Sequence, residues 1–294
     1  MEEIPCIVKV LHDIAPLYTP SGLEGELVYY IFETLHYNGF EVEIDDIGNV
    51  MAVRGGDMEA NLPMLSAHSD TVQRDRDYKI LRDVGVKFFY DEKYEIFYSN
   101  NANYYAGFDD KVGVAIILCL ANLTKLPFKV LIPVMEETGG EGVQEVPKRF
   151  ISSSMFNITL DRGGDGDIIT DYLGLQLAPQ KFSTEVIRIA RELGITLNEE
   201  VGTYADTYYT SFYTPGVNLS VGYYRPHQPG DFVHLPTAVG AMKIAESCIQ
   251  QRDRLRHFSN NWKEITLKRR KALMEDEDMR WGAIEDRYTW NYLR

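Results

Sequence analysis

Histidine and carboxylate side chains follow short apolar segments at five places along this 294-residue chain. The segment LPMLSA leads directly into His68, and Asp70 follows shortly after it. The other four places hold Asp109 with Asp110, Glu136 with Glu137, Asp161, and His227 with Asp231. Imidazole nitrogens and carboxylate oxygens can bind metal ions or transfer protons, so these residues could together form a hydrolytic metal site.

Each of these residues also has an ordinary structural explanation. A lone histidine is more often a satisfied structural residue than a ligand. Asp109 could cap the helix that follows it, and the Glu136–Glu137 pair could lie in a solvated loop. Burying the whole set beside an apolar sheet would cost several kcal/mol for each group unless the groups are paired or bind a cation. The set as a whole therefore favours a metal site.

The mixture of donors indicates which metal would bind. Four or five carboxylates stand with two imidazoles and no thiolate, a mixture that suits zinc, and cobalt or manganese less well. So many donors exceed the needs of one tetrahedral zinc ion but fit two ions that share a bridging carboxylate. Two such ions can activate a water molecule and stabilise a tetrahedral oxyanion. One carboxylate would then stay unbound as the general base.

The elements that must position these residues alternate between strands and helices. Strand candidates lie at 62–68, 128–136, 156–161 and 217–224, and two more lie around a turn within 41–56. Helix candidates lie at 24–40, 109–125, 183–194 and 236–252. This alternation predicts an α/β fold with a mixed, mostly parallel central sheet flanked by helices. The carboxyl ends of such strands meet at one edge of the sheet, where sites assemble.

The order of the motifs resembles the di-zinc exopeptidase superfamily. This superfamily includes peptidase T, a tripeptide aminopeptidase, and the single-domain leucyl-type aminopeptidases. The segments AHSDTV, AGFDDKVGVA and MEETGGEG are near-verbatim family signatures. The segment VNLSVGYYRPHQPGDFV is similar to the closing motif of peptidase T, with one extra residue before the histidine. The resemblance covers residues 15–250 and implies metal-dependent hydrolysis of a peptide bond.

The resemblance also implies a role for each candidate residue. The ligands of two zinc ions would be His68, Asp109, Glu137, Asp161 and His227. Asp109 would bridge the two ions, and its peptide bond to Asp110 is expected to be cis. Asp70 would orient His68, and Glu136 would be the general base.

Two histidines compete for the last ligand position. In the peptidase T pattern, the ligand precedes an acidic-Phe-Val triplet by four residues. His227 keeps that spacing from Asp231, whereas His234 falls after the triplet. We therefore favour His227 as the ligand and assign His234 a structural role or a place at the rim of the site.

The chain departs from peptidase T after Asp161. Peptidase T carries an inserted lid domain there, and this chain has only residues 162–180 in that place. Residues 1–251 are therefore expected to form one catalytic domain without a lid. The segment GTYADTYYTSFYTPG matches the position of the family's substrate loop. Within it, Asp206 could recognise a free amino terminus or begin a helix, and tyrosines such as Tyr208 could stabilise an oxyanion or pack.

Residues 252–294 form a separate C-terminal segment. The segment contains all three tryptophans of the chain and carries a net positive charge, while the whole chain has a formal net charge of −14. We expect a helical extension that packs on the body of the protein. The alternative is a contact between copies in a homo-oligomer, because aromatic and arginine side chains are enriched at interfaces.

Composition argues against several classes of partner. The acidic balance argues against nucleic acid or an anionic membrane as the main partner. No apolar run reaches the ~20 residues of a membrane-spanning helix, and no signal peptide is expected. The cysteines Cys6, Cys119 and Cys248 form no disulfide framework, so we expect a reducing, cytoplasmic location and a packing role for Cys119.

Three functional hypotheses follow. The first is a zinc-dependent aminopeptidase that acts on small peptides. The second is a hydrolase of another amide, such as an N-acyl amino acid, because the same site performs that chemistry in the superfamily. The third is a non-catalytic binding protein on the same scaffold, which is disfavoured because no ligand or base position is lost.

Overall fold

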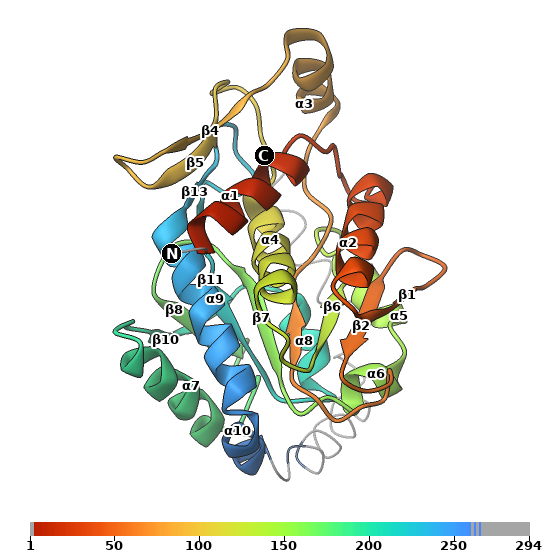
Figure 1. Cartoon of the computed structure of the whole chain (residues 1–294), viewed down its shortest axis with the longest axis vertical. Coiled ribbons are helices and arrows are strands. Elements are labelled where there is room, and N and C mark those ends of the chain that lie inside the picture. Colours follow the sequence, from red (N-terminus) through yellow and green to blue (C-terminus); the bar gives the residue numbers. More distant parts are fainter. Residues whose placement is uncertain (1–2, 260–261, 263–264, 266–294) are drawn as a thin grey trace.

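A mixed nine-stranded sheet forms the centre of the protein (Figure 1). The computed structural model describes residues 3–259 together with residues 262 and 265. The sheet order is β1-β2-β6-β3-β7-β11-β8-β10, and β9 pairs with β8. Its strands are β1 (Glu41–Ile44), β2 (Val50–Arg54), β3 (Met64–Ser66), β6 (Phe128–Ile132), β7 (Asn157–Arg162), β8 (Asp167–Tyr172), β9 (Leu175–Gln176), β10 (Asn198–Val201) and β11 (Gly216–Ser220). The central strands β6, β3, β7 and β11 are parallel, which confirms the predicted α/β class.

Helices cover both faces of this sheet. The face towards the viewer in Figure 1 carries α1 (Glu3–Ile14), α2 (Gly25–Tyr37), α4 (Phe108–Leu123) and α9 (Leu235–Gln250), with α7 (Gln180–Glu192) and α10 (Arg252–Ser259) beside α9. The other face carries α5 (Glu141–Glu145), α6 (Lys148–Ser152) and α8 (Asp206–Ser211). The predicted helices at 24–40, 109–125, 183–194 and 236–252 are confirmed as α2, α4, α7 and α9.

The central strands of the sheet are largely apolar on both sides because both faces are covered. Strand β2 is buried at every position, as expected for a strand between two layers of helices. Val50 and Ala52 of β2 belong to the larger core with α4, whereas Met51 belongs to the smaller core with α6. Successive side chains of a strand point to opposite faces, which explains this division.

Helix α4 lies directly against β7. A Cβ atom at Gly113 would collide with the carbonyl oxygen of Leu160, so only glycine permits this approach. The close packing fixes the first turn of α4, which carries Asp109 and Asp110, beside the end of β7, which carries Asp161. The sequence places these residues in loops and helix starts, but the contact itself depends on Gly113.

A smaller four-stranded sheet lies above the main sheet in Figure 1. It has the order β12-β13-β5-β4 and consists of β4 (Phe88–Asp91), β5 (Ile96–Ser99), β12 (Tyr223–Tyr224) and β13 (Phe232–His234). The β4–β5 hairpin projects from the body in Figure 1, and α3 (Asp75–Lys79) with the π-helix η1 (Ile80–Val84) precedes it. The sequence analysis did not predict α3, β4 or β5, nor strands β8 to β10. The loop between β12 and β13 carries His227.

One expectation about the cysteines was wrong. Cys6 of α1 and Cys119 of α4 form a disulfide, with their Cα atoms 5.9 Å apart. Cys248 is a buried free thiol. The two bonded cysteines are 113 residues apart in the sequence, so nothing in their spacing indicates that α1 packs along α4.

The beginning of the C-terminal segment packs on the body. Arg254 of α10 forms an ion pair with Glu185 of α7. Trp262 is buried, and its indole N–H donates a hydrogen bond to the carbonyl oxygen of Ser211 at the end of α8. Trp281 and Trp290 lie outside the described residues, so an oligomer contact through this segment stays a prediction. Among the described residues, no helix is both long and apolar enough to span a membrane.

Candidate metal centre

His68 stands at the centre of a cluster of carboxylates. It follows β3 and is 2% exposed. Its Nδ1 atom lies 3.0 Å from the backbone carbonyl oxygen of Asp70. A carbonyl oxygen can only accept, so Nδ1 carries a hydrogen and Nε2 is the ring atom that could bind a metal ion. Nε2 lies 3.3 Å from Asp109 Oδ1, 3.6 Å from Asp161 Oδ1 and 4.0 Å from Glu136 Oε2.

Asp70 connects His68 to the loop that carries the two glutamates. Its carboxylate lies 3.3 Å from His68 Nδ1. The same carboxylate accepts the backbone N–H groups of Glu136 and Glu137 at 2.9 and 3.0 Å, and the hydroxyl of Ser21 at 2.6 Å. Asp70 is fully buried. It therefore fixes the imidazole and the glutamate backbone relative to each other, which extends the orienting role expected from the sequence.

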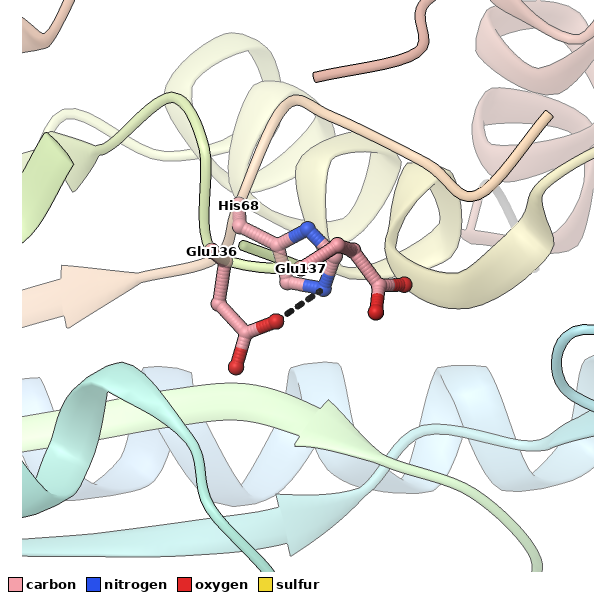
Figure 2. A group of neighbouring side chains, drawn as sticks. All are labelled: His68, Glu136 and Glu137. Atoms are coloured by element: carbon pink, nitrogen blue, oxygen red, sulfur yellow. Dashed lines mark ion pairs between the residues drawn. The ribbon is translucent and has the colours of Figure 1, made fainter. Parts of the chain in front are cut away.

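Glu136 and Glu137 point to opposite sides of the His68 ring (Figure 2). The ion pair between Glu136 and His68 is marked there, and the Glu137 carboxylate is turned away from it. The preceding residue, Met135, has a φ of 54°, which is uncommon for a residue with a side chain. Its N–H donates to the buried carboxylate of Glu24 at 3.2 Å. The turn thus separates two adjacent carboxylates so that each can have its own role.

Asp109 lies between the two histidines. One of its oxygens is 3.3 Å from His68 Nε2, and the other is 3.3 Å from His227 Nε2. The Asp109–Asp110 peptide bond is cis, as expected. Asp110 accepts backbone N–H groups from His68 and Gly113 instead of facing the cluster. Asp109 therefore has the geometry of a bridging ligand.

His227, and not His234, reaches the cluster. Its Nε2 atom lies 3.0 Å from Glu137 Oε1, and its backbone has a φ of 60°. His234 instead pairs its Nδ1 with the hydroxyl of Thr237 at 2.9 Å, where it precedes helix α9. The structure thus places His227 where the sequence analysis expected a ligand.

This difference between the two histidines gives a first prediction. Replacing His227 with alanine should weaken zinc binding at one of two sites by at least ~100-fold, because changes even to residues behind a ligand cost 10–100-fold in metal affinity. His234→Ala should bind zinc as the wild type does. Calorimetric titration of the metal-free protein would measure both. Equal zinc affinity in His227→Ala and the wild type would contradict the assignment.

Three overlapping groups of donors could each hold a metal ion. They are His68 with Glu136 and Glu137, His68 with Asp109 and Asp161, and Asp109 with Glu137 and His227, each with its ligand atoms within 4.8 Å of one another. The last two groups share Asp109. Every donor predicted from the sequence belongs to at least one group.

The cluster contains more carboxylates than imidazoles, so negative charge is in excess. Burial raises the pKa of Asp161 to about 6 and that of Glu136 well above its usual value. Burial also acts on Asp109, but its contacts with the two imidazoles outweigh it and lower the pKa of that carboxyl. Contacts with Asp109 and Glu137 raise the pKa of His227 to about 10. Carboxylates outnumber imidazoles, so additional positive charge would stabilise the ionised cluster, and the nitrogen and oxygen donors fit zinc.

Comparison with known proteins identifies the fold. The structure aligns with aminopeptidase PepT from Bacillus cereus ATCC 10987 with a TM-score of 0.71 and 14% identity, over 84% of this chain and 98% of that one. It aligns with a tripeptidase from Staphylococcus aureus with a TM-score of 0.70 and 15% identity, over 85% and 99% of the two chains. The TET1 peptidase of Pyrococcus horikoshii aligns with a TM-score of 0.62 and 15% identity, over 83% and 99%. The fold is that of the peptidase T and TET aminopeptidases.

Similarity in sequence is more local. A LysW-lysine/LysW-ornithine hydrolase from Pyrococcus abyssi is 38% identical over 65 residues, which are 22% of this chain and 19% of that protein. The corresponding hydrolase of Thermococcus kodakarensis is 34% identical over 65 residues, or 22% and 18% of the two chains. The match thus spans about a fifth of the length of these curated relatives. No protein-family model matches the chain.

In this peptidase fold, Asp206 lies buried beside the cluster at the start of α8. It is 2% exposed, and neither carboxylate oxygen has a hydrogen-bond partner within the described part of the chain. Burial raises its pKa to about 8, with contributions from Asp161 and Asp70. Tyr208 is half-buried and packs edge-on against Tyr172 and Phe212, so its ring takes part in an aromatic cluster.

Sequence reasoning missed several residues that hold the site. Ser21 and Glu24 lie in the segment TPSGLEGE, far from the ligands in sequence, yet they bind Asp70 and the backbone of Met135. Asp231 accepts the N–H groups of Ala106 and Phe108 at 2.9 and 3.0 Å, just before Asp109. The sequence analysis named Asp231 beside His227 and used it to choose between the two histidines, but it did not predict these backbone contacts. No local signal could have indicated these contacts.

Proposed function

We propose that this chain is a two-zinc aminopeptidase that cleaves small peptides. The observation that carries the proposal is the set of overlapping donor groups, in which Asp109 joins the His68 side to the His227 side. His68 and Asp161 would hold one zinc ion, His227 and Glu137 the other, and Asp109 both. Zinc held there supplies Lewis acidity, which lowers the pKa of a water molecule and stabilises a tetrahedral oxyanion. Cobalt or manganese could replace zinc with the same donors.

The protein's own residues would complete the reaction. Glu136 is buried beside His68 and would take a proton from the attacking water and pass it to the departing amine. Asp70 keeps the hydrogen of His68 on Nδ1 and holds the backbone of Glu136 at the same time. Because Asp70 holds both residues, Glu136 and His68 would keep their relative positions during the reaction.

A metal-reconstituted peptidase screen would test this proposal. The purified protein would be stripped of metal, reloaded with zinc, cobalt or manganese, and given aminoacyl anilides, dipeptides, tripeptides and N-acyl amino acids. We expect metal-restored cleavage of substrates with a free amino terminus. A Glu136→Gln preparation purified in parallel would report contaminating peptidases. Metal-loaded protein that cleaves none of these amides would contradict the proposal.

Hydrolysis of another amide is the second candidate. The local match to hydrolases named for LysW-lysine and LysW-ornithine supports it, because their names describe an amino acid released from a larger carrier. The same residues would perform the same chemistry. Preference for N-acyl or carrier-linked amino acids over free peptides in the screen would favour this candidate.

Asp206 separates these two candidates. A buried carboxylate without a partner suits a substrate ammonium group, and hydrogen bonds to charged groups contribute about 1.5–3 kcal/mol. We therefore expect Asp206→Asn to lower kcat/KM for leucine anilide by about 10- to 100-fold. For the matching anilide without the α-amino group, kcat/KM should be nearly the same in Asp206→Asn and the wild type. The exposed Asp165→Asn is the matched control, and an equal loss on both anilides would contradict recognition of the amino group.

A further inference from the structure

Tyr105 is a buried residue without a role in the proposed mechanism. It is 2% exposed, and its hydroxyl has no hydrogen-bond partner among the described residues. The adjacent Tyr104 is equally buried, but its hydroxyl accepts a hydrogen bond from Gln73 at 3.2 Å. Leaving a buried hydroxyl unpaired costs free energy, so such groups are rare and call for an explanation.

The backbone of Tyr105 is held firmly. Its N–H donates to the buried carboxylate of Asp77 at 3.2 Å, and its carbonyl oxygen accepts from Gln73 at 3.1 Å. The next N–H, of Ala106, donates to Asp231 at 2.9 Å. Asp77 lies in α3, Gln73 in the segment before α3, and Asp231 at the end of the loop that leads into β13. The position of the Tyr105 ring is therefore imposed by the fold and is not a chance arrangement of a flexible loop.

Tyr105 lies near the His227 side of the cluster, because Asp109, Glu137 and the backbone of His227 all act on its hydroxyl. Burial and the charges of Asp109, Asp231 and Glu137 raise the pKa of Tyr105 well above its usual value. The backbone N–H of His227 acts in the opposite direction and lowers the pKa of Tyr105. Tyr105 thus keeps its phenolic hydrogen, and that hydrogen has no acceptor among the described residues.

We propose that Tyr105 is a further catalytic residue, whose O–H donates a hydrogen bond to the carbonyl oxygen of the scissile amide as negative charge develops there. The assignment rests on the proposed amide hydrolysis. The acceptor, the substrate carbonyl oxygen, is present only when substrate is bound. The hydrogen bond becomes stronger as negative charge develops on that oxygen, so it stabilises the transition state more than the bound substrate. No proton is transferred in this role, and the phenol remains intact.

Tyr105→Phe tests the assignment, with Tyr104→Phe as the matched control. In zinc-loaded protein, Tyr105→Phe should lower kcat by about 10²- to 10³-fold, as loss of one oxyanion donor does elsewhere, with little change in KM. A phosphinic dipeptide, which mimics the tetrahedral oxyanion, should bind less tightly by a similar factor. Leucinamide, a planar amide, should bind as it does to the wild type. Tyr104→Phe should match the wild type in all three measurements.

Thermal stability and zinc content separate catalysis from structure. Removing an unsatisfied buried hydroxyl should leave the Tm of Tyr105→Phe equal to or above that of the wild type, with zinc content unchanged. A lower Tm, failure to fold or loss of zinc would overturn the assignment in favour of a structural role. Unchanged kcat and unchanged affinity for the phosphinic dipeptide would overturn the assignment of Tyr105 but leave the proposed amide hydrolysis standing. A wild type that neither cleaves amides nor binds the phosphinic dipeptide would overturn the proposed function together with it.

Discussion

Glu136→Gln should lower kcat for peptide hydrolysis by about 10²- to 10⁴-fold, the range that general-base catalysis contributes. Glutamine has almost the same shape as glutamate but cannot accept the proton of the attacking water. Burial raises the pKa of Glu136 well above its usual value, which brings a carboxyl closer to the proton affinity that a general base needs. Steady-state kinetics of the zinc-loaded variant would measure the loss.

The first residue of the following helix, α5, offers a control for this change. Glu141 lies five residues further along, and its side chain is exposed. Glu141→Gln should therefore retain full activity, and both variants should bind as much zinc as the wild type. Full peptidase activity in Glu136→Gln would show that another group accepts the proton and that the proposed mechanism is wrong.

Asp109→Asn should have the largest effect on metal binding. Its two oxygens each lie 3.3 Å from a different histidine, so this one change alters both proposed zinc sites. We expect zinc affinity to fall by about 100-fold or more at each site and peptidase activity to fall with it. A ligand that binds only the native state raises Tm, so added zinc should raise the Tm of the wild type much more than that of the variant.

An exposed aspartate tests whether charge alone explains the result. Asp75 lies on the surface at the start of α3, and Asp75→Asn removes the same negative charge from the protein. It should bind zinc and respond to zinc in thermal denaturation as the wild type does. Two tightly bound zinc ions in Asp109→Asn would contradict the bridging role, because each site would then be complete without this residue.

Local sequence patterns were sufficient for most of the sheet and its helices. The short apolar runs that became β3, β6, β7 and β11 are bounded by turn residues, and the long periodic segments became α2, α4, α7 and α9. Such patterns depend only on neighbouring residues and are therefore visible in the sequence. Strands β8 to β10 were missed because their residues are polar or exposed at several positions and lack a clear alternation.

The sequence by itself determined which residues could bind metal and in what order they occur. The resemblance of its motifs to the di-zinc exopeptidase superfamily implied His68, Asp109, Glu137, Asp161 and His227 as donors, and such motifs are local properties of the sequence. It also favoured His227 over His234, and the structure places His227 at the cluster.

Only the tertiary structure decided how these residues are held. Asp70 binds the backbone of both glutamates, Ser21 binds Asp70, and Cys6 meets Cys119. Tyr104 and Tyr105 are both buried, but the hydroxyl of Tyr104 accepts a hydrogen bond from Gln73, whereas that of Tyr105 has no partner among the described residues. These facts depend on the packing of segments far apart in the chain, where small shifts in distance decide whether a polar group finds a partner. Residue type and spacing carry no information about such distances, so sequence reasoning could identify the donors but not the network that positions them.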